Sequence, residues 1–194
     1  MRFEVILIYA LLINYTPFHG EKEVSQIAVI DLENDYSRDF YKRILGRIEL
    51  FYNVPFNIDT THIIIIDKDE IDVTAFVKQT EDSIGDNSKK YYLFFTSRPI
   101  YIGRKELKLR GFASKNVAIV SSNKIIEESS SEALYENTLY KTSIHEVGHL
   151  LGLKHCEYDL KCFMVSSLPS ATNFLNSENN LCENCKAIIC NYLK

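Results

Sequence analysis

The 194-residue sequence has little of several features that define specialised architectures. Seven glycines and four prolines are too few for a collagen-like or proline-rich chain. The net charge is −4, so the chain lacks the excess of basic residues that is typical of binding to nucleic acid or to an anionic membrane surface. Hydrophobic residues make up 46% and charged residues 25%, which is the balance of a globular domain rather than of a disordered chain.

The sequence also lacks a hydrophobic run long enough to cross a bilayer. The run near the N-terminus, Val5–Ile13, has nine apolar residues, whereas a spanning helix needs about 20. It fits the hydrophobic region of a secretory signal, so residues 1–20 are expected to be a signal peptide. The alternative is a buried first strand. Export to the periplasm or the medium follows from the first interpretation and a cytoplasmic location from the second; neither predicts stable membrane insertion.

Apolar segments of strand and helix length alternate along the middle of the chain. Helical spacing places Phe40, Ile44, Ile48 and Phe51 on one helix face, and residues 71–84 are either a second helix or a surface excursion. Strand-like runs occur at 26–32, 63–66, 91–96, 111–114 and 116–121. This alternation predicts an α/β (α+β) fold. Ser129 and Glu132 are placed as a capping box for the next helix.

The histidines and cysteines are crowded into the last quarter of the chain. Three of the five histidines lie between His145 and His155, and all five cysteines lie between Cys156 and Cys190. This crowding is typical of metal sites rather than of core packing.

The histidines have the spacing of a catalytic zinc site. Positions four apart share a helix face, so His145 and His149 can bind one ion, with Glu146 beside the first ligand. Gly152 can end the helix in a left-handed conformation and turn the chain so that His155 supplies a third nitrogen. Three protein ligands with one open position indicate a catalytic rather than a structural zinc.

This run of residues resembles that of the metzincins, and the residues after it resemble the archaemetzincins in particular. Cys156, Cys162 and Met164 follow the last histidine, and Cys182 and Cys185 come later. One residue more than is usual for the family separates Cys156 from Cys162. The resemblance implies a metzincin-like fold, with a twisted mixed sheet of about four to five strands packed on helices and a small zinc-braced C-terminal subdomain.

The same resemblance implies a role for each residue of the motif. His145, His149 and His155 would bind the catalytic zinc, Glu146 would be the general base, and Met164 would form the methionine turn. The second, structural zinc would be held by four thiolates: Cys156, Cys162, Cys182 and Cys185. Two zinc ions are therefore expected.

The cysteines also have an interpretation of their own. Four thiolates form a closed tetrahedral zinc site, whereas export would permit a pair of disulfides instead. The last two ligand cysteines belong to a C-terminal helix from about Leu181, whose buried stripe is predicted to be Leu181, Cys185, Ile188 and Tyr192. Cys190 is left over and is expected to be buried as a small apolar residue.

The predicted reaction is hydrolysis of a peptide bond in a peptide or protein substrate. Zinc supplies a Lewis acid and an acidified water, and Glu146 takes and returns the proton. Gly111, Phe112 and Ala113 are expected to form an edge strand that pairs with the extended substrate. Residues 166–169 are expected to wall the pocket beyond the cleaved bond, and Tyr101 and Tyr140 are possible transition-state donors.

The predicted organisation is one peptidase domain, residues 21–194, with an upper subdomain (21–151) and a cysteine-rich lower one (152–194). The alternative function is a non-catalytic zinc-stabilised binding module on the same fold. A weaker alternative is a disulfide-stapled secreted domain that binds metal only incidentally. The sequence does not predict an oligomeric state or a substrate sequence.

Overall fold

The computed structural model describes residues 26–33, 38–54, 56–57, 69–84, 90–103, 105–166 and 180–192. The predicted signal segment 1–20 and the strand predicted at 63–66 lie outside the described residues. Within them, no helix is both long and apolar enough to cross a membrane.

A five-stranded mixed sheet forms the centre of the molecule, in agreement with the predicted fold class. Its order is β2-β1-β4-β8-β7, and four neighbouring strands are parallel. The strands are β1 (Gln26–Asp31), β2 (Phe56–Asn57), β4 (Lys90–Thr96), β7 (Gly111–Ser114) and β8 (Val117–Ser121). Strand β7 pairs antiparallel with β8 and forms one edge of the sheet.

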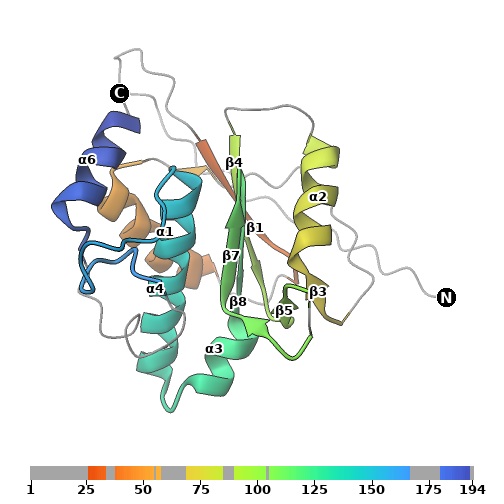
Figure 1. Cartoon of the computed structure of the whole chain (residues 1–194). Helices are drawn as coiled ribbons and strands as arrows, with labels where there is room; N and C mark the ends of the chain where they lie inside the picture. The colour runs from red at the N-terminus through yellow and green to blue at the C-terminus, as the bar shows by residue number, and fades with distance from the viewer. Residues whose placement is uncertain are drawn as a thin grey trace.

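Helices cover both faces of this sheet (Figure 1). Helices α1 (Arg38–Tyr52) and α4 (Glu132–Leu150) pack on one face, and α2 (Val73–Ile84) packs on the other. A hydrophobic core lies on each face of the sheet, and strand β4 contributes side chains to both. Leu93 and Phe95 face α1 and α4, whereas Tyr92 and Phe94 face α2. Burial on both faces explains its continuous apolar sequence.

The segment 71–84 begins with a strand and continues as a helix. Strand β3 (Ile71–Asp72) pairs with β5 (Ile100–Tyr101), which pairs with β6 (Lys108–Leu109), and this second sheet was not predicted. Strands of two residues are too short to show an alternating pattern in the sequence.

The capping box predicted at Ser129 and Glu132 is wrong. Helix α3 (Ser122–Glu128) ends at Ser129, whose hydroxyl donates to the Ile125 carbonyl at 2.6 Å. The N-cap of α4 is Ser131, whose hydroxyl oxygen accepts from the Leu134 N–H at 3.2 Å. Ser129 is therefore occupied in ending the preceding helix, two residues before α4 is capped.

Helix α6 (Glu183–Tyr192) contributes Cys185 and Ile189 to the core that α1 and α4 form on their face of the sheet (Figure 1). Leu181 and Cys185 are buried as predicted, but the stripe continues to Ile189 at 6% exposure, whereas Ile188 is 48% exposed. Steps of four residues, not three, keep to the buried face here. Cys190 is exposed, so its predicted burial is wrong.

Candidate metal centres

The last turns of α4 bring the three predicted histidine ligands together. The Nε2 atoms of His145 and His149 are 3.1 Å apart, and one nitrogen from each of the three histidines lies within 4.8 Å of the others. Gly152 has φ +83° and its N–H donates to the His149 carbonyl at 3.0 Å. This left-handed residue ends the helix as predicted and turns the chain toward His155.

Backbone carbonyls orient two of the imidazole rings. His145 Nδ1 is 3.2 Å from the Phe163 carbonyl oxygen, and His149 Nδ1 is 2.8 Å from that of Leu153. A carbonyl oxygen only accepts, so each Nδ1 carries the proton. The Nε2 lone pairs then point at the shared position, which is how metal-binding histidines are commonly held.

The surroundings keep these histidines neutral, which is the form that binds metal. Burial, together with the charge of neighbouring His149, lowers the pKa of His145 from 6.5 to about 3. Burial also lowers the pKa of His149 and of His155. Less proton competition at neutral pH favours metal binding.

Glu146 lies beside the histidines in a nearly closed environment. It is 7% exposed, and burial raises the pKa of its carboxyl from 4.5 to about 8. Gly111 of β7 is its neighbour across the sheet edge: a Cβ built on Gly111 would lie 2.6 Å from Glu146 Oε1. The carboxyl group therefore occupies space that any other residue at position 111 would fill.

Met164 packs directly beneath the histidine-bearing turn. A Cβ built on Gly148 would lie 2.5 Å from Met164 Sδ, so the absence of a side chain on this helical residue admits the methionine. Met164 is fully buried in the core on this face of the sheet.

The four predicted cysteine ligands form a second cluster, between the turn after α4 and helix α6. Their Sγ atoms all lie within 4.8 Å of one another. The Sγ–Sγ distance is 3.6 Å between Cys156 and Cys182 and 3.7 Å between Cys162 and Cys185. These separations are close to the ~3.8 Å edge of a tetrahedron with Zn–S bonds of about 2.3 Å. All five cysteines are free, so the structure has no disulfide among them.

A single short segment links the two clusters. Cys162 belongs to the thiol cluster, while the carbonyl of the next residue, Phe163, orients His145. The Cys156 N–H donates to the Met164 carbonyl at 2.8 Å, which closes the turn just after His155. The cysteine cluster thus braces the chain that supplies the third histidine and the methionine.

Both donor sets fit zinc by their chemistry. Neutral imidazole nitrogens and thiol sulfurs are the ligands that zinc prefers. The histidine set has three nitrogens and leaves one tetrahedral position open, whereas the cysteine set is complete with four sulfurs. Burial raises the pKa of the Cys162 and Cys185 thiols, so zinc binding there would displace protons.

The residues expected to contact substrate differ in how far the structure describes them. Gly111, Phe112 and Ala113 lie on edge strand β7 and are half-buried. Ser166 is half-buried, and residues 167–169 lie outside the described part of the chain. Tyr101 lies on β5 of the small sheet, and the ring of Tyr140 packs under the Arg47 guanidinium at 3.4 Å, on the side of α1.

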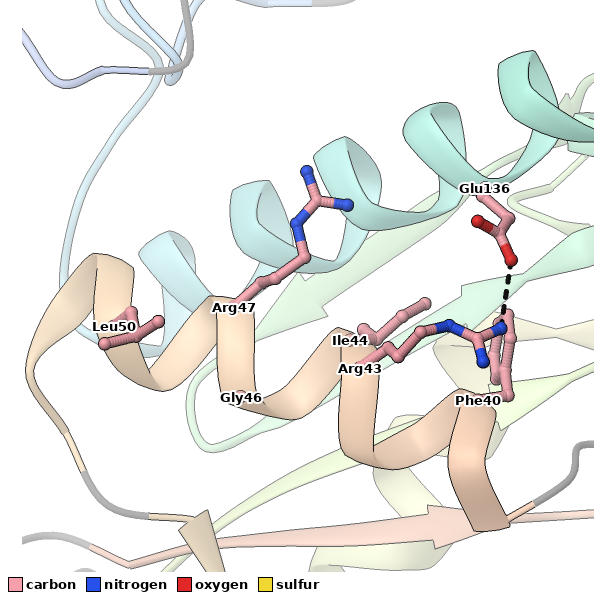
Figure 2. Close-up of a pocket in the computed structure, with 7 residues that line it drawn as sticks. All are labelled: Phe40, Arg43, Ile44, Gly46, Arg47, Leu50 and Glu136. Atoms are coloured by element: carbon pink, nitrogen blue, oxygen red, sulfur yellow. Dashed lines mark hydrogen bonds and ion pairs between the residues drawn. The ribbon is translucent and has the colours of Figure 1, made fainter.

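A pocket lies between α1 and the first half of α4, and it contains none of the predicted site residues (Figure 2). An ion pair of 3.0 Å between Arg43 and Glu136 crosses it, and Leu50, 86% exposed, lies at its edge. Its lining residues are Phe40, Arg43, Ile44, Gly46, Arg47, Leu50 and Glu136.

Sequence reasoning missed the groups that support the ligands. The carbonyls of Phe163 and Leu153 leave no signal in side-chain patterns. Gly148 lies inside the recognised motif, but its packing against Met164 depends on a segment sixteen residues later. Tyr52 adjoins Phe51 of the predicted apolar stripe, and only its depth of burial distinguishes it.

Relatives among characterised proteins are similar over half of the chain or somewhat more. An archaemetzincin from Haloquadratum walsbyi is 27% identical over 120 residues, covering 61% of this chain and 67% of that protein. An archaemetzincin from Halobacterium salinarum is 31% identical over 98 residues, covering 50% of this chain. The chain spans about half the length (56%) of this second relative.

Solved structures share the fold more widely. The crystal structure of archaemetzincin from Methanopyrus kandleri has a TM-score of 0.70 at 18% identity and covers 91% of this chain and 99% of that one. That of archaemetzincin from Archaeoglobus fulgidus, complexed with malonate, has a TM-score of 0.59 at 20% identity and covers 84% of this chain and 99% of that one. The model of peptidase family M54 matches residues 72–191. The chain belongs to this family and is an archaemetzincin-type zinc metallopeptidase.

Proposed function

We propose that the protein hydrolyses peptide bonds at a zinc ion held by His145, His149 and His155, with Glu146 as general base. The observation that carries this proposal is the convergence of one nitrogen from each of three neutral imidazoles, with the residue after the first of them, Glu146, carrying a buried carboxyl group. When bound, zinc would supply a Lewis acid that polarises the scissile carbonyl and acidifies a water.

Glu146 is suited to moving the proton. Its carboxyl is buried, and the pKa of about 8 that burial gives it applies to the chain without metal. A cation at the histidine nitrogens would lower that pKa toward neutrality, where a group can both accept a proton and return it. Glu146 would take a proton from the attacking water and deliver it to the leaving amine.

The substrate would bind along strand β7 as an added strand. Strand β7 is a sheet edge, and its side-chain-free Gly111 packs against the Glu146 carboxyl. An extended peptide that pairs with this edge would carry its scissile bond past the histidine cluster. The substrate would then lie between the predicted upper subdomain, residues 21–151, and the lower one, residues 152–194.

The four cysteines would hold a second, structural zinc that leaves no position open for a substrate. Its support is the gathering of four sulfurs within 4.8 Å of one another and the hydrogen bonds that join Cys156 to Met164 and Cys182 to Cys162. This zinc would contribute directly to the free energy of folding.

Glu146→Gln tests the proposed reaction. We expect kcat toward a peptide library to fall by about 100-fold or more, because general-base catalysis is lost, while two zinc ions per chain are retained by elemental analysis. Glu136→Gln is the matched control: it removes a carboxylate from the exposed half of the same helix and should leave kcat unchanged.

Two results would count against this function. Zinc-loaded wild type that cleaves no peptide would favour the non-catalytic binding module. Full activity in Glu146→Gln would show that another group accepts the proton.

A further inference from the structure

The side chain of Tyr52, the last residue of α1, packs against the part of α4 that carries His145 and His149. It is 3% exposed, and its hydroxyl donates to the Ile144 carbonyl of α4 at 2.8 Å. That carbonyl immediately precedes His145. The same hydroxyl is 4.0 Å from Met164 Sδ, so it touches both the helix of the first two ligands and the methionine turn.

Gly148 completes this contact. A Cβ built on Gly148 would lie 2.7 Å from the Tyr52 hydroxyl and 2.5 Å from Met164 Sδ. Three segments far apart in the sequence therefore meet at one point, directly behind the helical turn that bears His145 and His149. The preceding residue, Phe51, packs on Phe163 with ring centroids 5.1 Å apart, which anchors the same end of α1 to the turn.

The hydroxyl is a fixed donor. Burial raises the pKa of Tyr52 well above its usual value, so the phenol stays protonated. A buried hydroxyl without a partner is costly, so the bond to Ile144 defines where the end of α1 lies against α4. Phenylalanine would fill the same volume without this constraint.

We propose that Tyr52 is a positioning residue for zinc binding: its hydroxyl holds the His145–His149 turn of α4 at a fixed distance from Met164. Tyr52 acts through the Ile144 carbonyl and the Gly148–Met164 contact, and touches neither metal nor substrate. The inference rests on the proposed function only in taking the three histidines as ligands. Groups that orient metal ligands from outside commonly change metal affinity by 10–100-fold when removed.

Tyr52→Phe tests the proposal with a readout other than activity. We expect zinc to bind the histidine site about tenfold more weakly in chelator competition, while the cysteine site keeps its affinity. Cobalt(II) distinguishes the two sites, because thiolate ligands give strong charge-transfer absorption that histidine nitrogens do not. The cobalt d–d bands of the histidine site should shift in Tyr52→Phe.

Tyr92→Phe is the control, because it removes the hydroxyl of another fully buried tyrosine, in the core on the opposite face of the sheet. It should lower thermal stability without changing either metal affinity or the cobalt spectrum. Equal zinc affinity and equal spectra in Tyr52→Phe and wild type would overturn the proposal. A wild-type chain that binds cobalt through thiolates alone would instead overturn the proposed function, and the role of Tyr52 with it.

Discussion

Two glycines that lie within helices have opposite surroundings. A Cβ added to Gly46 of α1 would have nothing within 4 Å, whereas a Cβ on Gly148 of α4 would meet Met164 and Tyr52 at less than 3 Å. Helix propensity favours alanine over glycine equally at both positions. Packing therefore decides whether alanine at position 148 raises or lowers the free energy of unfolding.

We expect Gly46→Ala to raise the free energy of unfolding by about 0.5–1 kcal/mol. Gly148→Ala should lower it by about 1–3 kcal/mol, because the added methyl displaces Met164 or Tyr52 from a packed core. Urea unfolding of both variants in parallel measures the difference. A Gly148→Ala variant as stable as Gly46→Ala would show that the methionine turn moves freely.

Gly111 has the same kind of close neighbour, but that neighbour is the proposed base. Gly111→Ala would bring a methyl group to 2.6 Å from Glu146 Oε1 and 2.9 Å from its Cδ, so the carboxyl group must move. We expect kcat to fall by about 10–100-fold, because displacing a catalytic group by an ångström has effects of this size. Zinc content should be unchanged, and a loss of zinc in parallel with activity would contradict this explanation.

At the scale of elements, α6 is joined to the turn after the histidine-bearing helix through the cysteine cluster. Cys185 is buried at the cluster, whereas Cys190 of the same helix is exposed and lies outside it. Substitutions at these two positions therefore distinguish the effect of losing the cluster from the effect of losing a cysteine elsewhere on the same helix.

Cys185→Ser should remove one zinc per chain and lower the stability of the zinc-loaded protein. The loss would be on the order of 4 kcal/mol where free zinc is a thousandfold above its Kd. Cys190→Ser should retain both zinc ions and the wild-type melting temperature. Metal analysis with thermal unfolding checks both, and equal stability of the two variants would mean that the cluster does not hold a structural ion.

At the scale of the whole molecule, the stability of the metal-free chain depends on pH through its buried ionisable groups. The pKa of His145 falls from 6.5 to about 3 on folding, so the unfolded chain binds more protons between these values. The stability gained by keeping this ring neutral is full above pH 6.5 and is lost as pH falls toward 3.

We therefore expect metal-free wild type to lose stability on acidification more steeply than His145→Gln. The difference between the two slopes should approach about 1.4 kcal/mol per pH unit, the effect of one proton. Urea unfolding from pH 7 to pH 4 measures it. Parallel profiles would show that His145 is not buried in the metal-free chain.

Burial of Glu146 has the opposite effect on the pH dependence of stability. Its pKa rises from 4.5 to about 8 on folding, so its favourable contribution is full below pH 4.5 and is lost as pH rises through 8. Glu146→Gln should make the metal-free chain less sensitive to pH between 6.5 and 8.5. Unfolding measured over this range checks the prediction, and an unchanged pH profile would contradict the burial of the carboxyl group.

The sequence by itself was sufficient to predict the candidate ligands and their local geometry. His145 and His149 share a helix face because the α-helix repeats every 3.6 residues, and Gly152 is suited to the left-handed turn that follows. The buried stripe of α1 follows from the same helical periodicity, and the strands β1, β4 and β8 follow from short continuous apolar runs. These features depend on residues close together in the chain.

Other features were decided only by tertiary structure, because they depend on contacts between distant segments. Nothing local to Tyr52 predicts that its hydroxyl reaches Ile144, 92 residues away. The exposure of Cys190 depends likewise on which face of α6 packs against the rest of the fold. Periodicity determines which face of an element is apolar, but the three-dimensional fold determines which partner that face meets, and so what supports the metal ligands.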